Sequence, residues 1–300
     1  MTLEQLRIFV AVAVREHVTR ASGELNLTQS AVSAAILALE TRYDVRLFDR
    51  VGRRIALTDA GRMFLGEARS VLARASRAET MLSELSGLKR GALNIAASQT
   101  VGNYWLPPLL AKYRKTFPGI DVRLLVGNTS SVATMVQEGI SEIGFVEGTI
   151  ADTHLATAPV AQDELVLVIA SKLAGAVPKK INAAFLKSLS WILREVGSGT
   201  REILETALVQ YGLSVKDLET QLELPSNEAV RSAVLSGAGA SVLSRMVVET
   251  GLASGILRPL DVSLPKRQFY VVKHKERTPT KASIEFYRLV AGPKCAFFSY

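Results

Sequence analysis

The sequence predicts an N-terminal all-α winged helix-turn-helix with a long linker helix, followed by an α/β domain large enough for two lobes. Residues 19–39 have the pattern of two short helices joined by a tight turn, and no proline interrupts the chain before Pro107. From residue 91 onwards, apolar strand-like segments alternate with helical ones, as in α/β domains. With 300 residues and 48% hydrophobic side chains, the chain can bury the cores of two domains.

The two short helices are predicted from their caps and from one apolar face. Thr19 can cap a helix that runs to Leu25, and Asn26 tolerates the backbone of a tight turn. Thr28 can cap the second helix, whose apolar side chains recur at i, i+4 and i+7. These buried positions are Val32, Ile36 and Leu39. An earlier amphipathic helix, with its apolar stripe at Leu3, Leu6, Phe9, Val10 and Ala13, can pack behind the pair.

The other face of the second helix is small and polar. It begins at Thr28 and presents Gln29, Ser30, Ser33 and Ala34. Such a surface can lie in the major groove of double-stranded DNA and read base edges. The alternative is a plain helical hairpin with a polar outer face.

Two short β-prone segments, residues 45–50 and 54–58 with a turn at 51–53, follow the second helix and predict a wing. Five arginines lie in or beside it: Arg42, Arg46, Arg50, Arg53 and Arg54. We expect Arg50, Arg53 and Arg54 to contact DNA phosphates or a narrow minor groove. The alternative is a solvated, charged turn.

The composition favours a polyanionic partner and argues against several other classes. The net charge is +8, and residues 1–90 hold 14 basic and 10 acidic side chains, so the basic density is higher at the front of the chain. A single cysteine, Cys295, and three scattered histidines predict no disulfide framework, no metal site and no cofactor. No secretory pattern and no apolar run of membrane-spanning length occurs, which predicts a soluble, cytoplasmic protein without a membrane partner.

Thr58 and Asp59 begin the predicted linker helix, which has a narrow heptad seam. The seam consists of Phe64, Ala68, Val71, Ala75, Ala78, Leu82 and Leu85. A stripe this narrow suits pairing with the same helix of a second copy. We prefer this interpretation because symmetric DNA sites require two DNA-binding domains. Packing of this helix against the chain's own second domain is the alternative.

Four motifs in the first 88 residues occur in the order and spacing of a known family. They are Leu-Thr-Gln-Ser-Ala-Val-Ser (27–33), Ala-Leu-Glu (38–40), Arg-Leu-Phe-Asp-Arg (46–50) and Leu-Thr-Asp-Ala-Gly (57–61). With them, residues 1–88 resemble the DNA-binding half of a LysR-type transcriptional regulator. The chain departs from the family pattern at Ser22-Gly23, at Asp44 where glycine is usual, and at Ala34-Ala35 where larger polar residues are common. The last departure reduces direct base readout and gives more weight to Gln29, Ser30, Ser33 and DNA shape.

Beyond a predicted hinge at residues 87–91, strands and helices alternate. We expect strands at 92–97, 121–126, 143–146, 164–170, 191–193, 240–243 and 269–272. We expect helices at 105–116, 132–138, 201–211, 228–236 and 282–289. Continuous apolar strands of this kind suit parallel sheets covered on both faces.

This half resembles the effector domain of the same family, a two-lobed fold similar to periplasmic binding proteins. The resemblance implies three parts: a DNA-binding domain at 1–58, a linker and dimerisation helix at 59–88, and an effector-binding domain at 91–300. The chain is expected to cross between lobes twice. Lobe one would then hold residues 91–161 and 266–300, and lobe two residues 162–265.

Ligands of open α/β sheets bind beyond the carboxyl ends of strands, at helix N-termini that favour anions. Residues with hydroxyl, amide or guanidinium groups at such places are Ser98, Gln99, Thr100, Asn128, Thr129, Ser130, Thr200 and Arg201. Glu147, after another strand, and Asn227, at a further helix start, complete the predicted effector site. For any one loop, helix capping alone is the alternative. Arg201 is expected to grip a carboxylate or oxyanion.

Taken together, these features predict a sequence-specific regulator that binds double-stranded DNA, forms a homodimer or homotetramer, and responds to a small anion held between two lobes. RNA polymerase is a further candidate partner. Ser98-Gln99-Thr100, with Gly-Asn-Tyr-Trp-Leu-Pro (102–107) and Gly-Phe-Val-Glu-Gly (144–148), also resembles the branch of the family that governs sulfur assimilation or carbon dioxide fixation. A solute-binding transport protein and an enzyme are the competing classes. Neither an export signal nor a P-loop, dinucleotide fingerprint or G-x-S-x-G motif supports them.

Overall fold

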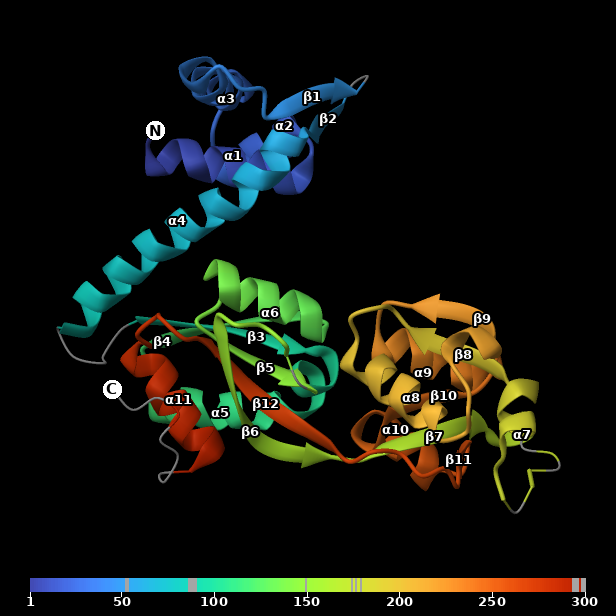
Figure 1. The fold of residues 1–300 in the computed structure, drawn as a ribbon. Helices are drawn as coiled ribbons and strands as arrows, with labels where there is room; N and C mark the ends of the chain where they lie inside the picture. The colour runs from blue at the N-terminus through green and yellow to red at the C-terminus, as the bar shows by residue number, and fades with distance from the viewer. Residues whose placement is uncertain are drawn as a thin grey trace. The chain divides into compact units, whose positions relative to one another are not determined.

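A computed structural model describes residues 1–51, 54–85, 91–148, 150–173, 175, 177–178, 180–292 and 297. The chain forms two compact units, the first mainly Met1–Gly87 and the second Leu88–Gln137 with Ser141–Tyr300. The first unit is helical with one small hairpin, and the second is an α/β fold (Figure 1). Both predicted fold classes are therefore present in the order expected.

The N-terminal unit contains three short helices, a two-stranded hairpin and one long helix. Its elements are α1 (Leu3–Arg15), α2 (Val18–Leu25), α3 (Gln29–Tyr43), β1 (Phe48–Val51), β2 (Arg54–Leu57) and α4 (Asp59–Leu85). Their apolar faces share one core built from Leu6, Phe9, Val12, Ala21, Val32, Ile36, Leu39, Leu47 and Ala68. Phe9 lies at its centre, with its ring against those of Phe48 and Phe64. The predicted apolar face of the second helix is buried here.

The turns of the helix-turn-helix depend on left-handed residues. Asn26 ends α2 with φ 54°, and Asp44 ends α3 with φ 50°. Asn and Asp are the non-glycine residues that adopt this conformation most readily, which explains how Asp44 can replace the usual glycine. Thr28 caps α3 as predicted, since its hydroxyl accepts from the Ala31 N–H at 3.2 Å. The predicted cap at Thr19 is wrong: the N-cap of α2 is His17, two residues earlier, and it makes no side-chain cap.

The predicted wing is an antiparallel hairpin of β1 and β2, with Phe48 opposite Leu57 and Val51 opposite Arg54. Its turn residues, Gly52 and Arg53, lie outside the described residues. The Thr58 hydroxyl accepts from the Gly61 N–H at 2.9 Å and donates to the Arg46 carbonyl at 2.8 Å. Thr58 therefore caps α4 and fixes its start to the base of the wing.

The linker helix α4 uses its apolar seam in two ways. Phe64 and Ala68, near its start, pack into the core of the N-terminal unit. Farther along, Val71 is partly exposed and Leu82 is 70% exposed. The seam therefore contributes to this unit's core over its first turns and leaves apolar side chains uncovered beyond them. The predicted hinge at 87–91 lies, up to residue 90, outside the described residues.

A five-stranded sheet forms the first lobe of the α/β unit, in the order β4-β3-β5-β12-β6. Its strands are β3 (Gly91–Ser98), β4 (Ile120–Gly127), β5 (Ile143–Glu147), β6 (Leu155–Asp163) and β12 (Arg267–His274). Helices α5 (Leu106–Thr116) and α11 (Lys281–Ala291) cover one face and α6 (Thr129–Glu138) the other (Figure 1). A short π-helix, η1 (Val101–Trp105), joins β3 to α5.

The second lobe has two smaller sheets, β10-β7-β11 and β8-β9, joined by a parallel bridge between Trp191 and Ala240. Its strands are β7 (Leu165–Ala170), β8 (Ser190–Arg194), β9 (Glu219–Leu224), β10 (Ser241–Ser244) and β11 (Leu257–Leu260). Its helices are α7 (Ala183–Ser188), α8 (Gly199–Val209), α9 (Asn227–Ser236) and α10 (Arg245–Ala253), with short 3-10 turns η2 (Ser171–Leu173) and η3 (Val215–Asp217). Leu204 and Leu208 of α8 pack on one side and Val230 and Val234 of α9 on the other.

The expectation of parallel sheets is only partly correct. Strand β3 pairs in parallel with β4 and β5, and β8 pairs in parallel with β9. Strand β12 is antiparallel to β5 and β6, and β7 is antiparallel to β10 and β11. The chain leaves the first lobe through β6 and β7 and returns through β11 and β12. The returning strands run in the opposite direction, so β11 is antiparallel to β7 and β12 to β6.

Candidate nucleic-acid interface and effector cleft

The predicted reading surface lies on the first turns of α3. Gln29, Ser30, Ser33 and Ala34 are all exposed, while Val32 between them is fully buried. The hydroxyl of Thr28 is occupied by the Ala31 N–H and lies 3.0 Å from the Ser30 hydroxyl. Thr28 therefore orients the helix start, and Gln29, Ser33 and Ala34 lie exposed on the turns that follow it.

The predicted phosphate contacts are partly described. Arg50 is exposed on β1, and the backbone of Arg54 pairs with Val51 across the hairpin. Arg53 lies outside the described residues. Arg42, at the end of α3, lies over the Tyr43 ring, with 5.6 Å between its guanidinium carbon and the ring centroid.

Glu40 of α3 holds the wing to this helix, a contact that the sequence analysis did not predict. Its Oε1 accepts from the backbone N–H of Leu47 at 2.7 Å and of Phe48 at 3.1 Å. One carboxylate oxygen of α3 thus satisfies two donors at the start of the hairpin. This contact joins the C-terminal half of α3 to the start of the hairpin.

In the α/β unit, four of the predicted effector residues are buried together at the carboxyl edge of the first-lobe sheet: Ser98, Thr100, Thr129 and Glu147. Glu147 Oε1 accepts from the Thr100 N–H at 3.2 Å, and the Glu147 carbonyl accepts from the Thr129 hydroxyl at 3.0 Å. The Ser98 hydroxyl is fully buried and has no hydrogen-bond partner among the described residues. These loops converge as predicted from strand and helix ends.

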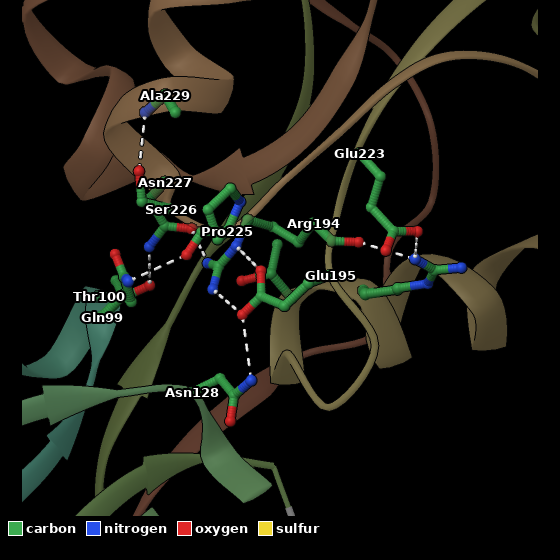
Figure 2. A network of polar contacts seen from close by, with 12 residues as sticks. Gln99, Thr100, Asn128, Arg194, Glu195, Glu223, Pro225, Ser226, Asn227 and Ala229 are labelled. Atoms are coloured by element: carbon green, nitrogen blue, oxygen red, sulfur yellow. Dashed lines mark hydrogen bonds and ion pairs between the residues drawn. The ribbon is translucent and has the colours of Figure 1, made fainter. Parts of the chain in front are cut away.

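The second lobe meets this edge through Asn227, which Arg194 holds in place, as Figure 2 shows. Asn227 Nδ2 donates to the Thr100 hydroxyl at 3.0 Å, and Asn227 Oδ1 accepts from Arg194 Nη1. Arg194, at the end of β8, is buried and also holds the carboxylate of its neighbour Glu195. Arg194 and Glu195 were not among the predicted site residues.

Three further contacts cross between the lobes. Asn128 Nδ2 donates to Glu195 Oε1 at 3.2 Å, and Gln99 Nε2 donates to the Pro225 carbonyl at 3.2 Å (Figure 2). The Ser130 N–H donates to the Gly197 carbonyl at 3.4 Å. The predicted residues Gln99, Asn128 and Ser130 are therefore all at the boundary between the lobes.

Gly199, at the start of α8, allows the lobes to approach closely. A Cβ added there would lie 2.6 Å from the Glu147 carbonyl oxygen and 3.0 Å from Thr129 Oγ1. Any larger residue would hold the N-terminus of α8 away from the edge of the first-lobe sheet. The two lobes are therefore in direct contact at this edge of the sheet.

The predicted role of Arg201 as an anion grip stays a prediction, and in this structure its guanidinium is paired within its own lobe. Its Nε donates to Glu205 Oε1 at 3.0 Å, and its Nη1 donates to Glu223 and to the Arg194 carbonyl. Burial alone would lower the pKa of Arg201, but its hydrogen bonds to Glu223 and Glu205 outweigh burial and raise that pKa. The guanidinium is therefore already neutralised by two carboxylates of its own lobe. Its neighbour Thr200, by contrast, is buried at the cleft.

Arg267 lies below the cleft, where the chain returns to the first lobe. Its Nη1 donates to the Thr200 hydroxyl at 2.9 Å and lies 3.9 Å from Glu147 Oε1. Its Nε donates to Asp163 Oδ2 at 2.8 Å. Arg267 and Asp163 were also missed from the sequence, although both occur where the chain was expected to cross between lobes.

The boundary between the lobes therefore combines hydroxyls, the N-termini of three helices, α6, α8 and α9, and two buried guanidinium groups. These are the groups with which proteins hold small oxygen-bearing anions. No cluster of three or more His, Cys, Asp or Glu side chains suited to a metal occurs among the residues that the structure describes. Within the same residues, no helix has both the length and the apolar character required to cross a bilayer.

Two family models match the chain. Residues 3–62 match "Bacterial regulatory helix-turn-helix protein, lysR family", and residues 86–292 match "LysR substrate binding domain". The first match covers the reading helix and the wing, and the second covers both lobes of the cleft. Together they include the four motifs and the alternating strands and helices on which the family resemblance was based.

Relatives match over almost the whole chain. The "Uncharacterized HTH-type transcriptional regulator YeiE" of Escherichia coli (strain K12) is 38% identical over 288 residues, which are 95% of this chain and 96% of the relative. "HTH-type transcriptional regulator CbbR" of Rhodospirillum rubrum is 33% identical, over 98% of this chain and 97% of its own. "HTH-type transcriptional regulator CysL" of Bacillus subtilis (strain 168) is 32% identical, over 90% of this chain and 91% of its own.

Solved structures share the fold. The crystal structure of full-length CbnR with its target DNA has a TM-score of 0.69 and 21% identity, and covers 97% of this chain and 99% of its own. CbbR and CysL relatives are consistent with the two branches suggested by the cleft motifs. All of these relatives are named as regulators, not as enzymes, in agreement with the prediction. The chain belongs to the LysR family and is a DNA-binding transcriptional regulator with an effector-binding domain.

Proposed function

We propose that this regulator binds specific DNA sites as a homodimer and that a small oxygen-bearing anion, held between the two lobes, modulates that binding. The hydrogen bond from Asn227 Nδ2 to the Thr100 hydroxyl is the main support for it. This bond brings side chains of both lobes to the carboxyl edge of one sheet, where α/β folds hold their ligands. Among the predicted effector residues, Arg201 is paired with two carboxylates of its own lobe.

The chemistry of the cleft favours an anion. Helices α6, α8 and α9 begin at Thr129, Gly199 and Asn227, and helix N-termini attract negative charge. The Ser98 hydroxyl, buried without a partner among the described residues, is available to donate to a ligand oxygen. Glu147 disfavours a highly charged anion beside it, or accepts from a hydroxyl of the ligand.

DNA recognition is divided between the helix and the wing. We assign base readout to Gln29, Ser30 and Ser33, with Ala34 allowing close approach of α3 to the groove. The wing arginines Arg50, Arg53 and Arg54 supply phosphate contacts. The exposed part of the α4 seam pairs two copies, and pairing of effector domains yields a tetramer. RNA polymerase is a candidate partner of the assembled complex.

The effector acts by shifting the equilibrium between two arrangements of the two DNA-binding domains in the dimer. A ligand shifts such an equilibrium only by its difference in affinity for the two states. Couplings of about 1–3 kcal/mol are typical, so changes of roughly 5- to 150-fold in DNA affinity are the expected range.

The test is footprinting and affinity measurement with the purified full chain on the DNA upstream of its own gene, with sulfate, phosphate or acetate at constant ionic strength. Gln29→Ala should weaken binding to the protected site more than binding to random DNA, because it removes base contacts. Arg50→Ala should weaken both equally and reduce the salt slope by about one unit. Equal losses for Gln29→Ala on both DNAs would contradict the assigned readout, and unchanged footprints with every anion would contradict the proposed effector class.

A further inference from the structure

The most unusual polar group in the second lobe is a buried guanidinium held by the next residue in the chain. Arg194 Nε donates to Glu195 Oε2 at 2.7 Å, and Arg194 Nη2 donates to Glu195 Oε1 at 2.8 Å. The Arg194 side chain is 3% exposed and that of Glu195 is 23% exposed. Two parallel N–H···O bonds of this kind are the geometry in which arginine binds carboxylate and oxyanion ligands.

The pair lies in the middle of a chain of hydrogen bonds that begins and ends in the first lobe, which can be followed in Figure 2. On one side, Asn227 connects Arg194 to the Thr100 hydroxyl of the first lobe. On the other side, Glu195 accepts from Asn128, also of the first lobe. The carboxylate of Glu195 therefore both neutralises the guanidinium and holds the lobes together.

Glu195 is a carboxylate at neutral pH. Burial opposes its ionisation, but the hydrogen bond and the charge of Arg194, with smaller contributions that include Asn128, outweigh burial and lower its pKa. Because Glu195 follows β8 and is partly exposed, its side chain has room to leave the guanidinium. Arg194 has no such freedom, since it is buried and also held by Asn227.

The other arginines near the cleft cannot serve as anchors in the same way. Arg201 donates to Glu205 and Glu223, which belong to its own lobe. Arg267 is bound to Asp163, and both side chains are excluded from solvent. Of these three arginines, only Arg194 donates two parallel N–H groups to a partly exposed carboxylate at the lobe boundary.

We propose that Arg194 is the effector anchor of the second lobe and that Glu195 is an internal competitor, which occupies the anchor until an anionic effector displaces it. The ligand is an anion with two adjacent oxygens, a carboxylate or a tetrahedral oxyanion. Displacement of Glu195 also releases Asn128, so ligand binding and the contact between the lobes are coupled directly. This inference rests on the proposed function, because it specifies the ligand contact of the same cleft.

The test is isothermal titration of the full chain with sodium sulfate, sodium phosphate or sodium acetate, at ionic strength held constant with sodium chloride. Glu195→Gln should bind the preferred anion at least about tenfold more tightly than the wild type, because the competing carboxylate is gone and a buried charge is left without its partner. Arg194→Gln should lose the binding. Glu223→Gln is the matched control: it removes a carboxylate from Arg201 in the same lobe with the same change of net charge, and should leave the affinity unchanged.

Glu195→Asp provides a second variant if the amide destabilises the lobe. It keeps the charge and shortens the side chain by one methylene, so its anion affinity should lie between those of the wild type and Glu195→Gln. Equal affinities for the wild type and for both Glu195 variants would overturn the competitor role, while leaving the proposed effector class intact. Unimpaired binding by Arg194→Gln would overturn the anchor. If neither the wild type nor any variant binds these anions while footprints on DNA persist, the anionic effector itself is wrong.

Discussion

Arg267 and Asp163 join the two strands that connect the lobes. Arg267 begins β12 and Asp163 ends β6, directly opposite each other in the sheet. Arg267 Nε donates to Asp163 Oδ2 at 2.8 Å, and the side chains are 0% and 1% exposed. Asp163 Oδ1 also accepts from the Ser244 hydroxyl at 2.7 Å, and Arg267 reaches Thr200. The ion pair thus fixes both connecting strands to the second lobe.

Replacing Arg267 by Met should lower the free energy of unfolding of the α/β unit by about 3–5 kcal/mol, because it leaves the Asp163 carboxylate buried without its cation. Urea denaturation followed by tryptophan fluorescence measures this, since the two tryptophans, Trp105 and Trp191, both lie in that unit. The control is Arg245→Met. Arg245 pairs with Glu164 next to the same strands, but the side chains are 43% and 62% exposed, so the loss should be at most about 1 kcal/mol. Losses of equal size would show that burial does not govern the contribution of these pairs.

Glu40→Gln should weaken the attachment of the wing to α3. An amide oxygen accepts more weakly than a carboxylate, and the N–H groups of Leu47 and Phe48 both depend on this one oxygen. We expect a loss of about 1–3 kcal/mol in the stability of the N-terminal unit and weaker binding to all DNA sequences. Amide hydrogen exchange of residues 45–58 and DNA titration measure the two effects. Glu24→Gln, which disrupts only an exposed pair with Arg15, should change neither.

The sequence predicted the N-terminal unit well because its information is local. Thr28, Asn26 and the apolar face of α3 lie within a few turns of one another, so caps and periodicity were sufficient. The contact of Glu40 with the wing was missed because it forms only after the chain reverses direction past Asp44. Strands β6 and β11 were missed for another reason: each contains a proline, Pro159 and Pro259, which is tolerated because both strands lie at sheet edges.

The cleft was harder to predict because it is assembled from distant parts of the chain. Thr100 and Asn227 were expected from their places after a strand and at a helix start, but no local pattern says that they touch. Arg194 was missed because it ends an apolar strand, where no local pattern marks it as a site residue. The pairing of Arg201 could have been predicted: Glu205, four residues later on the same helix, is a signal for an internal pair.

Gly61→Ala should destabilise the N-terminal unit strongly. A Cβ at this position would lie 2.1 Å from the Leu47 carbonyl oxygen, a backbone atom that cannot move without opening the wing. Overpacking of this kind costs about 1–3 kcal/mol, and we expect at least that. Far-UV circular dichroism on heating and hydrogen exchange of α1 measure it. Gly23→Ala, in α2 with no atom within 4 Å of the added Cβ, should be neutral or stabilise by up to about 1 kcal/mol. A neutral result at Gly61 would show that the wing and α4 separate easily.

Tyr104 should make the stability of the α/β unit depend on pH in the alkaline range. Its hydroxyl donates to Glu228 Oε1 at 2.8 Å, from η1 to α9. Burial, the hydrogen bond to Glu228 and the charge of Glu228 together raise the pKa of Tyr104 to about 12, against an ordinary value of 10.0. A raised pKa means that the fold favours the neutral phenol. This contribution is complete below pH 10 and is lost as the pH rises towards 12.

Tyr104→Phe removes this dependence, so the stability of the wild type should fall relative to that of the variant between pH 10 and 12. The difference in ultraviolet absorbance between the two proteins on alkaline titration gives the pKa of Tyr104 directly. Glu228→Gln keeps a hydrogen-bond acceptor but removes the charge, and should move that pKa part of the way back towards its ordinary value. If the difference spectrum titrates at the ordinary value in the wild type, the Tyr104 hydroxyl is not held by Glu228 in solution, and the lobes do not meet at this point.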